Sequence, residues 1–535
     1  MLVRHVGAAV RQDDWAAPVR RLRLREAQWL DESARSHQQR AGRKHVLMFS
    51  FQQVPPWLEI EYSVAAALRL RGHRVDGILC DGLLPRCEMN LGRIDRPPCE
   101  VCAGWLARYE DAFGFAFTRL TAFLASEDLA RAERDVAATP DEELAALIVD
   151  EVNVGRLAAR ELQRYARGFV FDAPADSAYR HWLVSAVLLV RLAGRLLERE
   201  CPDIVVMANG RTLPTACLLA VARRRGVDVV TWDTEPTHAD GLVFAHNQAA
   251  VEIPLDDLWP EAATRPLTSA ETKKLAGFLR GWERGENTPF PFNPAPVEDR
   301  AAIGAHLGLR VGAPLVVAFT NAAWDMAVVD RDRAFASMFD WLFALVDHAA
   351  AHPEIDLVVR AHPAETNVPP DLQSRTPVTT EIRARRGSLP ENIKLVDGRS
   401  RVSSYVLAEM ADIVTVYASR IGLEIAMRGK RPWLAGQMTY RSRGFTRDLT
   451  SKQDMLERLA GRVAEDPLSR DEIDLAMRFA YLWFFRYVTR IPLLRPRDGR
   501  FVLRTFRDLA PGVHPIIDRL CHALVTGAPF VDLDS

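Results

Sequence analysis

The chain has no excess of charge and no long apolar run. It carries 69 Lys and Arg against 70 Asp and Glu over 535 residues, a net charge of −1, so no basic field favours a nucleic-acid partner. The most apolar run, residues 182–190, is far shorter than the roughly 20 residues that cross a bilayer. It is predicted to be a buried helix.

The opening residues also lack the apolar core of a secretory signal, since Arg4 and His5 lead directly into Arg11 and Asp13. We expect a cytoplasmic protein. Residues 1–44 are rich in Arg and could lie against the anionic inner face of a membrane. Asp31 interrupts the positive face, which favours a solvated leader helix.

Repeats and low-complexity tracts are missing, and 48% hydrophobic residues over this length suit two large domains. The predicted organisation is a leader at 1–44, a first domain at 45–260, a linker at 261–310, a second domain at 311–465 and a helical tail at 466–535.

In the first domain, strands at 45–51 and 75–80 flank a helix at 58–70, which predicts a βαβ unit. Its first turn lacks G-x-G-x-x-G, which argues against an ordinary dinucleotide site there. Residues 105–200 are predicted to be a helical insertion. The α/β pattern returns with strands at 203–207 and 227–232.

The second domain alternates strands and helices, which predicts a parallel sheet covered on both faces. Its predicted strands are 315–320, 357–360, 393–396, 413–416 and 432–434. Because such sheets bind ligands beyond the carboxyl ends of their strands, the residues that follow each strand are the candidates for a site.

Arg360-Ala361-His362-Pro363 follows the strand 357–360. Arg360 and His362 are predicted to point into the ligand crevice, where both can donate to a phosphate. Taken alone, the motif is equally well explained by a histidine that stabilises a turn. Asn321, at the tip of the domain's first strand, is predicted to be an ordinary turn residue.

Ser419, Gly422 and Glu424 follow the strand 413–416. Ser419 is predicted at a helix N-terminus, where its hydroxyl, exposed N–H groups and the helix dipole can hold a phosphate. Gly422 lets the backbone approach closely, and Glu424 can accept from ribose hydroxyls. The alternative is an N-cap followed by a solvent-facing glutamate. The combination of these residues with Gly429-Lys430-Arg431-Pro432 favours a binding site.

Residues 316–446 resemble the capsule-polysaccharide synthesis proteins that include bacterial β-Kdo transferases. The resemblance rests on Arg360-Ala-His362-Pro363, Leu389-Pro390-Glu-Asn392-Ile, Ser403-Ser404-Tyr405, Ala411-Asp412-Ile-Val, Ser419-Arg-Ile-Gly422-Leu-Glu424, Gly429-Lys-Arg-Pro432 and Tyr440 with Gly444-Phe445-Thr446.

The resemblance implies an α/β fold of the GT-B type, with two Rossmann-like doubly wound domains facing a cleft. It also implies a C-terminal site for a nucleotide-sugar donor such as CMP-Kdo, to which Arg360, His362, Ser419 and Glu424 would contribute. Ser403 and Ser404, at the start of the next helix, offer a further phosphate-facing N-terminus. The first domain does not align with the characterised transferases.

Acceptor chemistry is expected from the first domain, where the loop after strand 227–232 holds Asp233, Glu235, His238 and Asp240. A general base or a carboxylate nucleophile needs such a cluster. We rank Glu235 first, Asp233 next and His238 third. The alternative is a polar loop with ordinary caps. Asn209-Gly210-Arg211 follows the neighbouring strand.

No D-x-D triplet ends a predicted strand, and GT-B enzymes commonly neutralise the leaving phosphate without metal, so no catalytic cofactor is expected. Cys80, Cys87, Cys99 and Cys102 nevertheless have the spacing C-x6-C-x11-C-x2-C. Structural Zn²⁺ is the simplest ligand, an iron–sulfur cluster is left open, and the alternative is four reduced thiols. Arg86, Arg93 and Arg96 of this loop could contact an anionic glycan.

The predicted function is therefore a glycosyltransferase that moves a sugar from a nucleotide donor to a surface or capsular polysaccharide or its glycolipid precursor. Peripheral association with the inner membrane or with other polysaccharide-synthesis proteins would suit such an acceptor. Two alternatives stay open: an epimerase of nucleotide sugars with the same fold, and a non-catalytic partner in glycan assembly.

Overall fold

The computed structural model describes residues 24–37, 42–51, 55–87, 99–125, 127–235, 237–283, 296–326, 328–368, 370, 373–461, 466–495 and 502–531. They form two compact units, each described separately. Unit 1 comprises Met1–Tyr165, Val170–Pro254 and Arg486–Ser535, and unit 2 comprises Ala166–Phe169 and Leu255–Phe485.

Unit 1 is built on a seven-stranded sheet in the order β15-β8-β7-β6-β1-β2-β3. The strands from β7 to β3 are parallel, whereas β8 and β15 pair antiparallel at the edge. The parallel part has the strand order of a Rossmann fold. The strands are β1 (His45–Ser50), β2 (Arg74–Leu79), β3 (Thr118–Arg119), β6 (Ile204–Ala208), β7 (Asp228–Thr234), β8 (Gly241–His246) and β15 (Thr489–Arg490).

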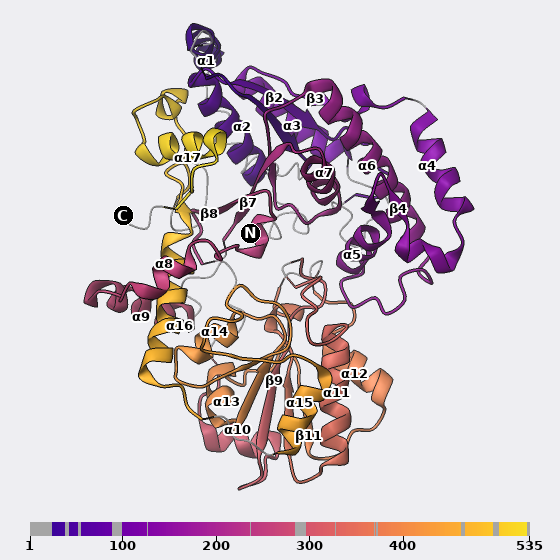
Figure 1. Ribbon diagram of the computed structural model, residues 1–535, viewed down its shortest axis with the longest axis vertical. Helices are drawn as coiled ribbons and strands as arrows, with labels where there is room; N and C mark the ends of the chain where they lie inside the picture. The colour runs from indigo at the N-terminus through magenta and orange to yellow at the C-terminus, as the bar shows by residue number, and fades with distance from the viewer. Residues whose placement is uncertain are drawn as a thin grey trace. The chain divides into compact units, whose positions relative to one another are not determined.

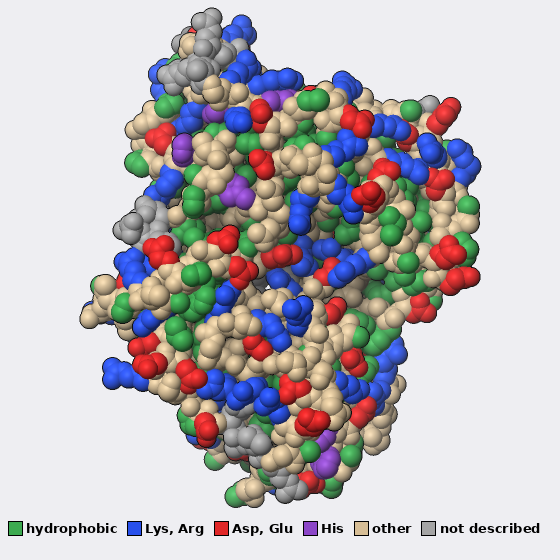
Figure 2. Space-filling model, viewed as in Figure 1, with side chains coloured by type: hydrophobic (Ala, Val, Ile, Leu, Met, Phe, Trp, Pro, Cys, Tyr) green, Lys and Arg blue, Asp and Glu red, His purple; other side chains and the backbone are tan. Residues whose placement is uncertain are grey.

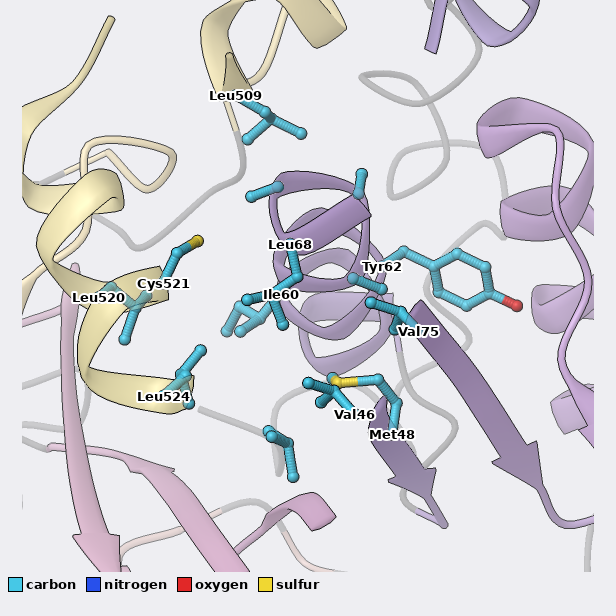
Figure 3. Packing of buried hydrophobic residues seen from close by; sticks show 14 of the residues in the cluster. Val46, Met48, Ile60, Tyr62, Leu68, Val75, Leu509, Leu520, Cys521 and Leu524 are labelled. Carbon is cyan, nitrogen blue, oxygen red and sulfur yellow. The ribbon is translucent and has the colours of Figure 1, made fainter. Parts of the chain in front are cut away.

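Both faces of this sheet are buried. Val46 and Met48 of β1 belong to one hydrophobic cluster, and Leu47 and Phe49 belong to another, as alternation along a strand requires. Figure 3 shows Val46 and Met48 near side chains of α2 and α17. The first cluster is completed by α1 (Leu24–His37), α2 (Pro55–Leu70), α3 (Cys99–Phe113) and α17 (Pro515–Thr526), and the second by α4 (Glu127–Ala138), α5 (Val154–Ala166), α6 (Tyr179–Glu200) and α7 (Leu213–Arg224).

The predicted helical insertion at 105–200 is present. Besides its helices it contains η3 (Leu120–Phe123), η4 (Asp141–Ala146) and a small hairpin of β4 (Ile148–Val149) and β5 (Val152–Asn153). The apolar run 182–190 lies within α6 and is buried along its whole length. Across the described ranges, no helix combines the length and apolarity that crossing a membrane requires.

The C-terminal segment differs from the expected tail. The chain returns to unit 1 after Phe485, and β15 pairs with the edge strand β8. Next, η9 (Phe506–Leu509) and α17 contribute apolar side chains that pack with those of α2, so α2 lies buried between the sheet and this segment. Only α16 (Arg470–Tyr481) and most of the following π-helix (Leu482–Arg486) stay in unit 2.

Unit 2 has a six-stranded sheet in the order β11-β10-β9-β12-β13-β14, with every pair parallel. Counted along the chain from β9, this is the order 3-2-1-4-5-6 of dinucleotide-binding folds. The strands are β9 (Leu315–Phe319), β10 (Asp356–Arg360), β11 (Ile393–Val396), β12 (Ile413–Val416), β13 (Trp433–Leu434) and β14 (Arg447–Asp448).

Helices cover both faces of this sheet as well. The connections from β9 to β11 carry α11 (Met338–Ala351) and α12 (Val378–Arg386), and those from β11 to β13 carry α13 (Ser404–Met410) and α14 (Ile421–Ala426). Right-handed crossovers that progress in opposite directions lie on opposite faces, and Figure 1 shows α11 and α13 on different sides of β9. The outer helices are α8 (Trp259–Thr264), α9 (Ser269–Glu283), α10 (Arg300–Leu307) and α15 (Lys452–Ala460).

The predicted fold class, two Rossmann-like doubly wound domains with a helical insertion in the first, is therefore confirmed. The segment 261–310, expected to be a linker, contributes α8, α9 and α10 to unit 2. Acidic and basic side chains are interspersed on the face shown in Figure 2, in keeping with the near-zero net charge.

Candidate functional site

The switch point of the unit 2 sheet lies between β9 and β12, where the chain proceeds to opposite sides. Asn321 spans this point: its Nδ2 donates to the carbonyl of Ala418 (2.8 Å), and its Oδ1 accepts from the Ala418 N–H (3.2 Å). Asn321 is 6% exposed. It fixes the carboxyl ends of the two strands against each other, a larger role than the turn residue that the sequence suggested.

Arg360, at the end of β10, lies in the protein interior, at 1% exposure. Its terminal nitrogens donate to the carbonyls of Asp397 and Ser400, in the loop after β11. Burial lowers its pKa to about 10, so it stays charged at neutral pH. The terminal nitrogens of Arg360 thus hold the loop after β11. Its positive charge lies near the carboxyl edge of the sheet.

His362 is half-buried and follows Arg360 at the same edge. Its Nδ1 accepts from the N–H of Ala364, which places the proton of the neutral ring on Nε2. Burial, together with the positive charges of Arg360 and Arg420, lowers the pKa of His362 to about 4. The imidazole is therefore neutral at pH 7 and lies within the field of two guanidinium groups.

Ser419 and Gly422 lie beyond β12. Ser419 is 8% exposed, and its carbonyl accepts from the Tyr440 hydroxyl (2.5 Å). It precedes Arg420, which occupies the N-cap position of α14 without a capping hydrogen bond from its side chain. A Cβ on Gly422 would overlap the Tyr440 hydroxyl and lie 3.1 Å from a methyl of Val416. Gly422 is thus required by the packing of Tyr440 beneath this turn.

Glu424 is 6% exposed, and both of its oxygens are engaged. One accepts from the Tyr405 hydroxyl (2.7 Å) and the other from Nε of Arg420 (3.1 Å). The Arg420 guanidinium also lies 3.7 Å from the ring centroid of Trp282. Glu424 therefore orients Arg420. The alternative interpretation, a glutamate that faces solvent, is wrong.

Ser403 and Ser404 begin α13. Ser403 is buried and caps the helix by accepting from the Val406 N–H (3.4 Å), while Ser404 is half-buried. The Ser403 hydroxyl has a structural use, as an N-cap.

Sequence reasoning did not select Arg420, although the spacing of four residues between Arg420 and Glu424 is that of a helical ion pair. Tyr440 appeared only within the resemblance. Its contact with Ser419 joins segments 21 residues apart, which no local pattern reveals.

In unit 1, the predicted acceptor-side residues lie at the end of β7 and in the loop between β7 and β8. One oxygen of Glu235 accepts from both the N–H and the hydroxyl of Thr237, within a tight turn, and Glu235 is 4% exposed. Nδ1 of His238 lies 3.2 Å from a terminal nitrogen of Arg490 on β15, and Asp240 is paired with the same guanidinium. The described residues of this loop are thus bonded to one another and to β15.

Asp233 lies one residue before the end of β7 and is linked to the neighbouring strand. Its Oδ2 accepts from Nδ2 of Asn209 (2.7 Å), which directly follows β6. Asn209 has a left-handed backbone (φ 59°), and its Oδ1 accepts from the N–H groups of Arg211 and Thr212. Asn209 thereby connects Asp233 to the N-terminus of α7, which the sequence did not predict.

The four cysteines lie around the end of β2 and the start of α3. All are half-buried, and none is in a disulfide. In the described part of the chain no three of their sulfurs come within 4.8 Å of one another. Arg86 lies in the same loop, while Arg93 and Arg96 lie outside the described residues.

A different set of side chains does gather. Ligand-type atoms of His45, Asp76 and Glu200 all lie within 4.8 Å of one another at the amino end of the unit 1 sheet. Arg74 contacts both carboxylates, at 2.6 Å from Asp76 and 3.7 Å from Glu200. The Arg74 guanidinium therefore already supplies the positive charge that the carboxylates of Asp76 and Glu200 attract.

No family model and no curated protein matches the chain. Among solved structures, the KpsC β-Kdo 2,4-transferase of Thermosulfurimonas dismutans is 15% identical, with a TM-score of 0.32 over 52% of this chain and 79% of that one. The UDP-GlcNAc 2-epimerase of Neisseria meningitidis is 11% identical, with a TM-score of 0.24 over 81% and 98%. The glycosyltransferase SsfS6 of Streptomyces sp. SF2575 is 11% identical, with a TM-score of 0.22 over 82% and 94%. At these scores the likeness assigns no substrate or reaction to this chain.

Proposed function

We propose that this chain is a glycosyltransferase that uses a nucleotide-activated sugar, of the CMP-activated acidic type such as CMP-Kdo. The acceptor is a surface or capsular polysaccharide or its lipid-linked precursor. The observation that carries the proposal is the positive edge of the unit 2 sheet. There the positive charges of Arg360 and Arg420 both lower the pKa of His362. These residues lie next to the switch point, where sheets of this topology bind nucleotides.

Arg420 is the proposed phosphate-binding cation. Glu424 and the Trp282 ring hold its guanidinium in place, so little side-chain freedom remains to be lost when an anion binds. The neutral His362 ring, with its proton on Nε2, and the Ser419 hydroxyl add uncharged donors. Arg360 contributes through its charge.

The proposed transfer breaks the bond between the anomeric carbon and the phosphate oxygen, and the nucleotide leaves with the electron pair. A new bond forms between that carbon and an acceptor hydroxyl oxygen, whose proton passes to a carboxylate. Fixed positive charge beside the leaving phosphate stabilises the negative charge that develops there, and no metal is required for this role.

The acceptor-side carboxylate is proposed to come from unit 1. Asp233, oriented by Asn209 at the carboxyl ends of β6 and β7, is the better-supported candidate. The other oxygen of Asp233 accepts from the Thr234 N–H (2.7 Å), so both of its oxygens are held in place. One oxygen of Glu235 accepts from Thr237, and His238 lies beside Arg490. Because Asn209 orients Asp233 at the carboxyl ends of the parallel strands, we rank Asp233 ahead of Glu235 for proton transfer, the reverse of the order that the sequence suggested.

Calorimetry with CMP, UDP and GDP tests donor binding. One nucleotide should bind, and Arg420→Met should weaken that binding by roughly 1–3 kcal/mol, the usual cost of losing a charged hydrogen bond. Arg458→Met is the matched control. Arg458 also forms an ion pair with an acid four residues away, on α15. Failure of all three nucleotides to bind would favour a non-catalytic glycan-assembly protein.

Product analysis separates a transferase from an epimerase. Incubation with the nucleotide sugar that binds should give free nucleotide only when a glycan acceptor is added. Epimerised donor without acceptor would contradict the proposal. Asp233→Asn should abolish transfer while leaving nucleotide affinity unchanged, whereas Glu235→Gln should retain activity.

A further inference from the structure

Four of the seven cysteines in unit 1 belong to three segments that are close in sequence. Cys80 directly follows β2, Cys87 lies in the loop beyond it, and Cys99 and Cys102 are in the first turn of α3. A separation of three residues places Cys99 and Cys102 on one face of the helix.

Cys80 and Cys99 are close neighbours. The backbone N–H groups of Gly82 and Leu83 donate to the Cys80 sulfur, and Cys99 acts electrostatically on the same thiol. Gly82 has φ +91°, and a Cβ there would lie 3.3 Å from the Cys99 sulfur. Gly82 therefore turns the chain and leaves room for Cys99 beside the turn that contains Cys80.

The other two cysteines pack against the hydrophobic clusters of unit 1. Cys87 and Cys102 both pack against the hydrophobic cluster that includes α2 and α3, and Cys80 and Cys87 both pack against the cluster on the other face of the sheet. Cys87 thus contacts both clusters. Cys102 follows Cys99 by one turn of α3, and Cys87 is separated from Cys80 by six residues, so both are tethered close to the Cys80–Cys99 pair.

We propose that Cys80, Cys87, Cys99 and Cys102 bind one zinc ion that ties the end of β2 to the first turn of α3. Four thiolates around zinc lie about 2.3 Å from the metal, which puts the sulfurs about 3.8 Å apart. Because no three of these sulfurs are within 4.8 Å of one another here, the cysteine side chains must turn toward one another when metal binds.

The chemistry of the corner suits a thiolate site. Backbone N–H groups that donate to a sulfur stabilise its anion, and a helix N-terminus does the same for Cys99 and Cys102. Zinc binds cysteine as the thiolate, so zinc binding displaces the protons of the thiols that it binds.

Elemental analysis of the purified full-length chain tests the proposal. Protein expressed with added zinc and purified without chelators should contain about one zinc per chain, and Cys99→Ser/Cys102→Ser should lose it. Cys201→Ser is the matched control, since Cys201 is an exposed thiol at the end of α6 and should leave the zinc content unchanged.

A second measurement uses the wild-type chain, so it does not require a variant to fold. Cobalt exchanged into the wild-type chain should show the strong visible absorption of a tetrahedral site, together with a sulfur-to-cobalt charge-transfer band. Zinc that is absent from the wild type, or that stays in the double variant, would overturn the proposal. So would iron accompanied by acid-labile sulfide, which would identify a cluster instead.

Discussion

Asn321 and Ala418 exchange two hydrogen bonds between the carboxyl ends of β9 and β12. The side-chain amide both donates and accepts, so it satisfies the N–H and the carbonyl of one residue. The Tyr417 hydroxyl, which also follows β12, donates to Asp332 in the loop after β9. The Asn321 amide and this hydroxyl therefore both hold together the edge at which the unit 2 sheet is proposed to bind a nucleotide.

Asn321→Asp should lower the free energy of unfolding by about 1–3 kcal/mol, because the carboxylate cannot donate to the buried Ala418 carbonyl. Urea denaturation measures this change. Asn153→Asp is the control: Asn153 is exposed and only accepts, from the Arg156 N–H, which a carboxylate can also do. Equal stability of the two variants would contradict the role given to Asn321.

Arg360→Met should reduce stability by about 2 kcal/mol or more, since the carbonyls of Asp397 and Ser400 lose their charged donor. If the guanidinium contacted the nucleotide directly, affinity would fall with little change in stability. Thermal unfolding and calorimetry on the same variant distinguish these outcomes. We expect the larger effect in unfolding.

Gly422→Ala should destabilise unit 2 because the added methyl overlaps the Tyr440 hydroxyl. Tyr440→Phe removes that hydroxyl and its bond to Ser419. The double variant should therefore be more stable than the sum of the single losses predicts, by about 1 kcal/mol. Additive losses in a double-mutant cycle would rule out the proposed overlap.

Burial raises the pKa of Glu365 to about 8, against donation from the Val378 N–H and the Ser374 hydroxyl. An unfolded glutamate ionises near 4.5, so between pH 4.5 and 8 the folded state holds a proton that the unfolded state has lost. Stability should fall as pH rises through this window. Glu365→Gln should flatten the slope between pH 7.5 and 8, where His362 is about 90% or more neutral in both states.

The matched control for this measurement is Glu391→Gln, at an exposed glutamate of unit 2. The pKa of Glu59 in unit 1 is also raised by burial to about 8 and adds a slope of the same sign. Melting temperature against pH should therefore be flattest in the double variant Glu59→Gln/Glu365→Gln. An unchanged slope in both single variants would refute the assignment.

A bound nucleotide should raise the pKa of His362 from about 4, because a phosphate favours the imidazolium form that burial, Arg360 and Arg420 now oppose. NMR titration of the ring follows the shift. The nucleoside without its phosphate should leave the pKa unchanged, and a nucleotide that binds without moving it would place the phosphate elsewhere.

The sequence was informative wherever a strand is buried on both faces. The strand predicted at 413–416 is observed with those bounds, and the one at 315–320 is a residue shorter, because continuous runs of Val, Ile and Leu are what parallel strands require. The short edge strand β15 was missed, since two residues without an apolar pattern are fixed only by their partner β8.

The site was less predictable, because its side chains, like β15, are fixed by partners elsewhere in the chain. A motif shows which residue types follow a strand, but not which of them are already bonded to the protein. Arg360 and Arg420 look alike in sequence, yet the first donates to two loop carbonyls and the second is held at a sheet edge by Glu424. These assignments depend on partners 4 to 40 residues away.

The return of Arg486–Ser535 to unit 1 sets an order of events during synthesis. All of unit 2 is made while the first sheet still lacks β15 and α2 still lacks the side chains of α17. Because domains generally fold as they leave the ribosome, we expect the second unit to finish folding before the first. Until the last residues emerge, the chain carries an open strand edge and an uncovered apolar helix.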